Sequence, residues 1–179
     1  MSGRKVGLAG LGHIGREVAK RLNAFGAVVS YYDVARAPNQ VEEELRVRFL
    51  PLPELLETSD VVSLHMPLTS ATRGIIGAAE LAALGADGIL VNTSRGDLVN
   101  EDALLAALTS GTIRAAMLDT LAQEPPNGVS KALAAASRCV VTPHSAGSSW
   151  ESWSRRCGNA VQNVERVWAG LDPRWVAQP

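Results

Sequence analysis

Seven short runs of β-branched and aliphatic residues recur along the chain, and longer segments rich in Ala, Leu and Glu separate them. We predict strands at residues 5–10, 27–32, 47–50, 60–65, 88–94, 113–119 and 138–143. Several of these runs are apolar at every position, so helices must cover both faces of the sheet that they form. The pattern predicts an α/β fold, a Rossmann-like doubly wound parallel sheet in a single three-layer domain over residues 1–179.

The segments between these runs predict the helices. We expect helices at residues 14–24, 53–57, 78–84, 101–109, 130–135 and 148–169. Asn100 offers a cap at a helix start, and Glu101 and Asp102 put carboxylates there, where the helix dipole favours them. The sequence shows no internal repeat and no linker.

Composition narrows the classes of function. With 179 residues, 46% of them hydrophobic, the chain can bury a core without disulfides. Seventeen Lys and Arg residues balance eighteen Asp and Glu residues, with no basic block. This balance argues against a nucleic-acid or membrane surface and favours a small molecule or another protein as the partner.

Cysteine usage and apolar runs indicate the compartment. Cys139 and Cys157 lack metal-ligand spacing, so we predict reduced thiols and no metal site. No apolar run is long enough for a signal peptide or a membrane span. We therefore expect a soluble, cytoplasmic protein.

The motif GLGHIG places Gly10, Gly12 and Gly15 after the first predicted strand and at the start of a helix. Alone, such a pattern is equally typical of a tight turn. The second strand, however, ends at Asp33, eighteen residues after Gly15, where a carboxylate can accept hydrogen bonds from the adenosine ribose. The combination predicts a dinucleotide. Asp33 would repel a 2′-phosphate, which favours NAD, while the nearby Arg36 leaves NADP open.

Polar residues follow the later strands, at the edge where a doubly wound sheet binds its ligands. Taken singly, His144 could be a packing residue, Glu124 a solvated acid, and Arg95 a salt-bridge partner of Asp97 or Asp119. Together they bring an arginine, a carboxylate and a histidine to the edge that holds the nucleotide. That combination predicts a hydride-transfer site.

These motifs resemble those of the D-isomer-specific 2-hydroxyacid dehydrogenases, specifically their nucleotide-binding domain. The resemblance covers nearly the whole chain and rests on GLGHIG, YYD, HMPLTSATRGII, NTSRGDLVNEDAL, AAMLDTLAQEPP and VVTPHSAGSSWES, in that order. It implies that Arg95 holds the carboxylate and carbonyl oxygens of a 2-hydroxy or 2-keto acid, that Glu124 pairs with His144, and that His144 handles the substrate's proton. It also implies NAD contacts from Gly10, Gly12, His13, Ile14, Gly15, Asp33, Met66, Thr93, Ser94, Arg95, Asp119, His144 and Gly147.

The chemistry suits these residue types. Hydride arrival at a keto carbon places negative charge on its oxygen, so a proton donor and a cation should both lie within reach. A carboxylate beside an imidazole favours the imidazolium form and fixes its orientation, which makes Glu124 an orienting partner. Arginine grips a carboxylate with two hydrogen bonds, which lysine does less well.

Full-length members of that family carry a second domain that closes over the substrate. The glycine motif of this chain begins at Gly10, so we expect these 179 residues to lack that domain. The closing segment, about residues 171–179, would pack on that domain. All four tryptophans lie in the last thirty residues. Trp150 and Trp153 share a helix face. They could pack in the core, or they could form a surface that binds a partner.

This difference from full-length members of the family leaves the partner and the function open. We expect a homodimer or a complementing substrate-domain chain as the partner. Three functions remain: the catalytic NAD domain of such a dehydrogenase, poorly active alone; a non-catalytic NAD(H)-binding or partner-binding module; and a chain that folds without a role.

Overall fold

The structure is a computed structural model that describes residues 1–176. The chain divides into two bodies, Met1–His144 and Ser145–Pro179, each of which is described here by itself.

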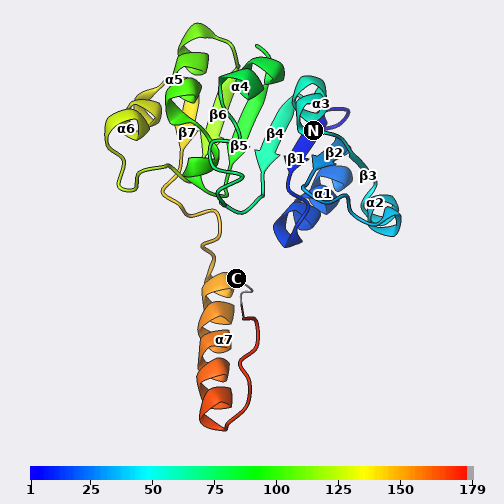
Figure 1. Cartoon of the computed structure of the whole chain (residues 1–179), viewed down its shortest axis with the longest axis vertical. Helices are drawn as coiled ribbons and strands as arrows, with labels where there is room; N and C mark the ends of the chain where they lie inside the picture. The colour runs from blue at the N-terminus through cyan, green and yellow to red at the C-terminus, as the bar shows by residue number, and fades with distance from the viewer. Residues whose placement is uncertain (177–179) are drawn as a thin grey trace. The chain divides into compact units, whose positions relative to one another are not determined.

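The first body is built on one sheet of seven parallel strands in the order β3-β2-β1-β4-β5-β6-β7 (Figure 1). The strands are β1 (Lys5–Ala9), β2 (Val28–Tyr32), β3 (Val47–Phe49), β4 (Val61–Leu64), β5 (Ile89–Asn92), β6 (Ala115–Leu118) and β7 (Cys139–Val141). The strand order reverses direction between β1 and β4, so a crevice is expected at their carboxyl ends. The predicted doubly wound fold is confirmed, and each strand lies within its predicted range.

Helices follow most strands, and their contacts separate them into two layers. They are α1 (His13–Ala24), α2 (Asn39–Leu45), α3 (Leu52–Thr58), α4 (Ala78–Leu84), α5 (Glu101–Ser110) and α6 (Gly128–Ala135), with a short 3-10 helix, η1 (Gly96–Leu98). Each of α3 to α6 contacts the next, whereas α1 and α2 contact each other. Right-handed crossovers place these two groups on opposite faces of the sheet. Helix α2 is absent from the sequence prediction.

The interior is mainly aliphatic. Leu64 and Leu90 point from β4 and β5 into the larger cluster of buried residues, and both are fully buried. Leu8 and Tyr31, also fully buried, lie in a smaller cluster around β1 and β2. Burial of a side chain of this size stabilises the fold by about 1.5–3 kcal/mol. The packed sheet fixes the positions of the loops at its carboxyl edge.

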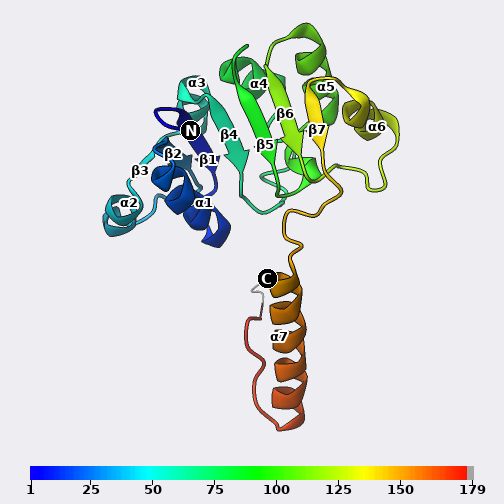
Figure 2. The same cartoon turned by 180° about the vertical axis from the view of Figure 1, so that it is seen from behind.

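One face of the sheet is less covered than the other. Successive strand residues point to opposite faces, and on β6 Ala116 and Leu118 are buried while Met117 between them is 49% exposed. Val140 on β7, paired with Met117, is also exposed. Figure 2 shows β4 to β7 from the side opposite α4 and α5. Val91 of β5, paired with Met117, is half-buried, so the less covered apolar surface extends over β5, β6 and β7.

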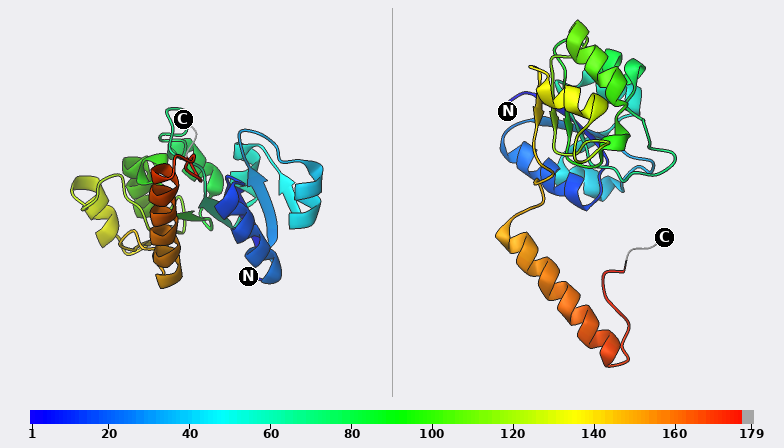
Figure 3. Two further views of the ribbon diagram at one scale, coloured as in Figure 1. Left: turned by 90° about the horizontal axis from the view of Figure 1, so that it is seen from below. Right: turned by 90° about the vertical axis from the view of Figure 1, so that its left-hand side faces the viewer.

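The second body contains one long helix, α7 (Trp150–Trp168), and the segment that follows it (Figure 3). Ser149 caps the helix, because its side chain accepts a hydrogen bond from the Ser152 N–H. The Asn163 side chain exchanges two hydrogen bonds, each 2.8 Å long, with the Arg174 backbone. Residues 171–176 of the predicted closing segment thus fold back along α7, while residues 177–179 lie outside the described residues.

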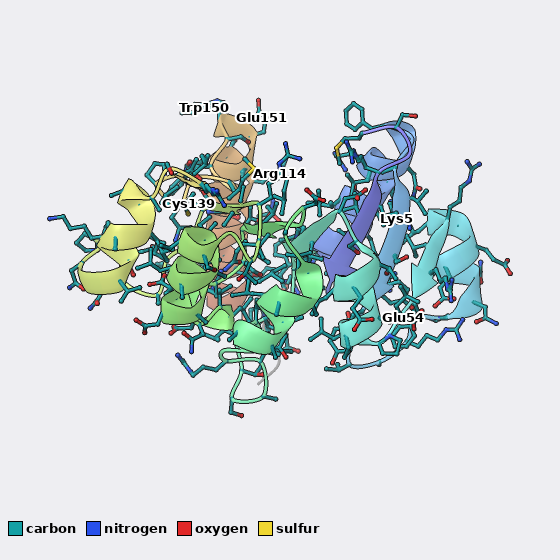
Figure 4. All side chains as sticks on the ribbon, turned by 90° about the horizontal axis from the view of Figure 1, so that it is seen from above. Lys5, Glu54, Arg114, Cys139, Trp150 and Glu151 are labelled. Atoms are coloured by element: carbon teal, nitrogen blue, oxygen red, sulfur yellow. The ribbon has the colours of Figure 1, made fainter. Side chains whose placement is uncertain are left out.

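Helix α7 has an apolar face that the described residues of its own body leave exposed. None of its nineteen residues is buried. Trp150, Trp153, Val164 and Trp168 are all more than half exposed, and Figure 4 labels Trp150 in the first turn. Among residues 1–176, no helix combines the length and apolarity that crossing a membrane requires.

Candidate active site

The glycine motif forms the turn from β1 into α1. A Cβ added at Gly15 would lie 3.1 Å from the Gly10 carbonyl carbon and closer still to its oxygen, so only glycine fits at position 15. Gly12 caps α1 and faces open space, since a Cβ there would meet no atom within 4 Å. His13 and Ile14 begin the helix, where backbone N–H groups have no partner inside it. The turn therefore offers a phosphate both space and hydrogen-bond donors.

Asp33 follows β2 beside this turn. Its Oδ2 accepts a hydrogen bond of 2.8 Å from the Leu11 N–H, and its Oδ1 accepts one of 2.8 Å from the Val34 N–H. An ionised carboxylate has about four acceptor sites, so two remain for a ribose diol. The residues present fit the adenosine half of a dinucleotide.

A hollow of about 440 Å3 lies at the carboxyl ends of β1, β4 and β5. Five residues predicted to bind cofactor or substrate line it together: His13, Ile14, Met66, Ser94 and Arg95. His65 also lines it; burial lowers the pKa of its imidazole, which lies 3.0 Å from the Ser63 hydroxyl. The glycine turn and Arg95 therefore share one hollow.

Buried Asn92 shapes the turn that carries Arg95. Its amide group donates a 2.8 Å hydrogen bond to the Arg95 carbonyl oxygen, and its Oδ1 accepts one from the Ser94 N–H. The Ser94 hydroxyl in turn donates to the Met66 carbonyl oxygen at 2.8 Å, which ties the ends of β4 and β5 together. Asn92 was not predicted as a site residue, although a buried amide at the end of an apolar strand is a signal for one.

The Arg95 guanidinium is exposed and donates a 2.7 Å hydrogen bond to the Ser94 carbonyl oxygen. Asp97, one of its hypothetical partners, is paired instead with Arg73 at 2.7 Å. The interpretation of Arg95 as a structural partner of Asp97 is therefore wrong.

Glu124 and His144 form the pair that the family resemblance implies. His144 Nδ1 lies 2.8 Å from Glu124 Oε2, and Glu124 Oε1 accepts a hydrogen bond of 2.9 Å from the Leu121 N–H. These two contacts, with the histidine first, lower the pKa of Glu124. The contact through Nδ1 leaves the far ring nitrogen, Nε2, to face a ligand.

The backbone of His144 is itself unusual. Its φ is 51°, in the left-handed region that non-glycine residues seldom adopt. Such conformations cost about 1–3 kcal/mol and gather at functional sites. The His144 N–H is held by the Thr142 carbonyl oxygen at 2.9 Å. This hydrogen bond holds the backbone of the turn, and the contact with Glu124 orients the ring.

Two further residues hold the loop that carries Glu124. A Cβ at Gly96 would overlap the backbone of Leu121, so glycine allows the loops after β5 and β6 to touch. Glu101, at the start of α5, accepts a 2.8 Å hydrogen bond from the Ala122 N–H and another from the Ser130 hydroxyl. Glu101 thus anchors the loop as well as starting a helix.

The end of β6 is tied to the residue after β7. Asp119 is buried, its N–H donates to the Asn92 carbonyl oxygen, and its Oδ1 accepts a hydrogen bond of 2.5 Å from the Thr142 hydroxyl. Next to it, Thr120 is buried, and its hydroxyl has no hydrogen-bond partner among the described residues. Thr93, by contrast, is exposed.

The predicted residues thus fall into two neighbouring groups along one sheet edge. Glu124 and His144 line a separate hollow of about 420 Å3 with Leu121, Pro125 and Pro143. Gly147 belongs to the second body, and its role stays a prediction. Within residues 1–176, no three His, Cys, Asp or Glu side chains gather as metal ligands would.

A third hollow, about 500 Å3, lies at the amino ends of β1 and β2. Lys5 and Glu54, both labelled in Figure 4, help to line it. Parallel sheets of this kind bind ligands at the carboxyl ends of their strands, so this larger hollow lies at the wrong edge for the predicted chemistry.

Comparison with known proteins identifies the family. Residues 1–146 match the model of the D-isomer specific 2-hydroxyacid dehydrogenase NAD binding domain. The chain is 43% identical over 164 residues to a glyoxylate reductase of Korarchaeum cryptofilum, and this match covers 90% of the chain and 48% of the relative. It is 39% identical over 170 residues to a hydroxypyruvate reductase of Thermotoga maritima, covering 94% of the chain and 53% of the relative.

A solved structure agrees. The D-lactate dehydrogenase of Lactobacillus jensenii with NAD+ superposes with a TM-score of 0.90 at 34% identity, over 98% of this chain and 56% of that one. The chain therefore spans about half the length of these relatives. With its glycine turn and Asp33 fitting the adenosine half of the cofactor, the chain belongs to the D-isomer-specific 2-hydroxyacid dehydrogenase family, as an NAD-binding domain.

Proposed function

We propose that this domain carries out hydride transfer between NAD(H) and a 2-hydroxy or 2-keto acid, using Arg95, Glu124 and His144. The observation that carries the proposal is the 2.8 Å contact between His144 and Glu124, at the same sheet edge as the NAD-binding turn. A module that only binds NAD needs no proton donor, because nucleotide binding moves no proton. The pair is suited to general acid catalysis.

In the direction of reduction, the keto oxygen gains a proton while the carbonyl carbon gains a hydride. Bound NADH would supply that hydride and so be oxidised to NAD+. His144 delivers the proton to the oxygen, and Glu124, kept ionised by its lowered pKa, holds the imidazole in place and stabilises its charged form. The product is the 2-hydroxy acid, and a proton from water restores His144.

Arg95 binds the substrate carboxylate in this proposal. Its guanidinium is exposed and contacts only a neighbouring carbonyl oxygen among the described hydrogen bonds, so its remaining donors are available. Arg95→Lys should weaken binding of a 2-keto acid about tenfold or more while NADH affinity changes little. NADH fluorescence titration with and without oxamate as a substrate mimic separates the two. An equal loss of NADH affinity would remove Arg95 from the substrate site.

His144 is tested by turnover. His144→Gln should lower the NADH oxidation rate with glyoxylate or hydroxypyruvate by about 100-fold or more, because general acid catalysis contributes about that much. NADH affinity should stay within about threefold of the original, a change below 1 kcal/mol. Undiminished oxidation in the variant would refute the acid role.

The active form is proposed to include a substrate domain, in the same chain or in another. Two apolar surfaces support this: the face of β5 to β7 with Met117 and Val140, and the face of α7 with Trp150 and Trp153. Relatives about twice as long contain further polypeptide to cover such surfaces. Without closure over the site, water remains and electrostatic stabilisation is weaker, so the chain alone should turn over slowly.

Light scattering combined with an NADH oxidation assay tests whether the active form needs a substrate domain. A monomer at micromolar concentration that gains activity on addition of a relative's substrate domain would support the proposal. A stable homodimer that is fully active would instead show that a second copy covers these faces.

The second candidate is a non-catalytic NAD(H)-binding module, which is favoured by the separation of Arg95 and the Glu124–His144 pair into two hollows. It predicts tight NADH binding with no oxidation in the presence of any 2-keto acid, even after addition of a substrate domain.

We further propose a cytoplasmic location. It agrees with the two free thiols, of which Cys139 is buried with its pKa raised to about 11 by burial.

A further inference from the structure

The loop between β2 and α2 carries the cation closest in sequence to the proposed ribose site. It reads Asp33-Val-Ala-Arg36-Ala-Pro38, and Arg36 is its one basic residue. An arginine near the end of this strand commonly accepts the 2′-phosphate of NADP. The sequence alone leaves Arg36 free to do so, three residues after the carboxylate that favours NAD.

The structure shows that Arg36 is already occupied. Its Nε donates a hydrogen bond to Glu42 Oε1 at 2.9 Å, and its Nη2 donates one to Glu42 Oε2 at 2.8 Å. The guanidinium also lies over the ring of Phe49, 6.0 Å from its centre. Arginine and carboxylate in this parallel two-bond arrangement form one of the stronger polar contacts in proteins.

Glu42 is held from the other side as well. The buried Tyr31 hydroxyl donates a 2.7 Å hydrogen bond to Glu42 Oε1 and accepts one from the Ala37 N–H at 2.8 Å. The Glu42 side chain is only 11% exposed, against 59% for Arg36. Contacts with Arg36 and then Tyr31 lower the pKa of Glu42 to about 2, so the carboxylate stays charged at neutral pH. The anchor is therefore on α2, and the arginine is the exposed partner.

We propose that Glu42 is a specificity-determining residue for the dinucleotide, because it holds Arg36 against α2 and Phe49 and so withholds the guanidinium from a 2′-phosphate. Asp33 and Glu42 then exclude NADP in two different ways. Asp33 repels the phosphate directly, and Glu42 occupies the cation that would bind it. This inference rests on the proposed NAD site.

The test is a cycle of variants read by binding of NADPH and NADH rather than by turnover. Asp33→Ser removes the repulsion, and Glu42→Gln removes the charge that holds Arg36 while keeping the side chain's shape and one acceptor for Tyr31. Adding Glu42→Gln to Asp33→Ser should tighten NADPH binding about tenfold, within the range of coupling measured for neighbouring residues. NADH affinity should change less than about threefold between the same two proteins.

Matched variants identify the cause. Glu44→Gln removes the same charge from an exposed position on α2 and should leave the NADPH affinity of Asp33→Ser unchanged. Adding Arg36→Ala to the double variant should abolish the gain. Arg16 is the rival cation, since its Nε donates to the Leu11 carbonyl oxygen at 3.1 Å beside Asp33, so Arg16→Ala in the double variant should leave most of the gain intact.

The proposal would be overturned if Glu42→Gln did not increase NADPH affinity, or if Glu44→Gln increased it equally. It would also be overturned if Arg16→Ala removed the increase in NADPH affinity while Arg36→Ala did not. Far-UV circular dichroism and the unfolding midpoint in urea show that each variant is folded. The unmodified chain serves to separate the two levels of inference. If it binds no NADH, the proposed function fails; if it binds NADH but the cycle shows no coupling, only the role of Glu42 fails.

Discussion

Two glycines of the NAD-binding turn should lose NADH binding for different reasons when each is replaced by alanine: Gly15→Ala by unfolding the turn, and Gly12→Ala without loss of stability. At Gly15, an alanine Cβ would lie 3.1 Å from the Gly10 carbonyl carbon and closer to its oxygen. Backbone atoms cannot relieve this contact by changing rotamer, so Gly15→Ala should cost about 3 kcal/mol of unfolding free energy, the upper part of the range for overpacking. NADH binding should be lost with the turn.

At Gly12 the same methyl group enters open space, and the backbone (φ −70°, ψ −163°) is accessible to alanine. Alanine is a poorer helix cap than glycine, which lowers stability, but it also reduces the entropy of the unfolded chain, which raises stability. Because these effects nearly cancel, the unfolding free energy should change by less than about 1 kcal/mol. The methyl nevertheless occupies the space where a pyrophosphate must approach. We expect NADH affinity to fall at least about tenfold, which corresponds to about 1.4 kcal/mol.

Urea unfolding followed by far-UV circular dichroism measures the first effect, and NADH fluorescence titration measures the second. Tryptophan fluorescence is unsuitable for the unfolding curve because all four tryptophans lie in the second body. Gly158→Ala on α7, where a Cβ also meets open space, is the matched control and should leave NADH binding unchanged. Normal NADH affinity in Gly12→Ala, or normal stability in Gly15→Ala, would refute the assignment of the turn.

Three further predictions concern the core, the loop anchor and pH. Leu90→Ala, at a fully buried position of β5, should lower the unfolding free energy by about 2–5 kcal/mol in urea titrations; a loss below 1 kcal/mol would contradict the described core. Glu101→Ala removes the hydrogen bonds to Ala122 and Ser130, so the NADH oxidation rate should fall while NADH affinity holds; equal loss of both would argue against a specific effect on Glu124. The pKa of Glu42 is lowered from 4.5 to about 2. The difference in unfolding free energy between the unmodified chain and Glu42→Gln should therefore be full above pH 4.5 and decline as pH falls towards 2. A difference that persists near pH 2 would show that the charge of Glu42 is not its source.

The alternation of apolar runs was enough to predict every strand, since each run is apolar enough to be buried on at least one face. Helix α2 was not predicted because its sequence, NQVEEEL, is only two turns long, and Val41 and Leu45 alone carry its apolar pattern. Two apolar positions cannot establish a period of 3.6 residues. Its position depends on Leu45 packing beneath β2 and β3, which is a tertiary effect.

The same limit explains what was missed at the site. The Glu124–His144 pair was predicted from a resemblance and is present in the structure, whereas the contact between Arg36 and Glu42 depends on the unpredicted helix α2. Asn92 and Glu101 act through hydrogen bonds to backbone groups of loops, Asn92 within its own turn and Glu101 on the loop after β6. Residue type and spacing do not specify contacts of this kind, because any polar side chain near a loop could make them.

The most direct test of the central claim is a titration of the purified chain with NADH and, separately, with NADPH. We expect saturable binding of one NADH per chain, with NADPH at least about tenfold weaker because Asp33 repels its 2′-phosphate and Glu42 occupies Arg36. Absence of NADH binding by a folded chain, or equal affinity for the two cofactors, would contradict it.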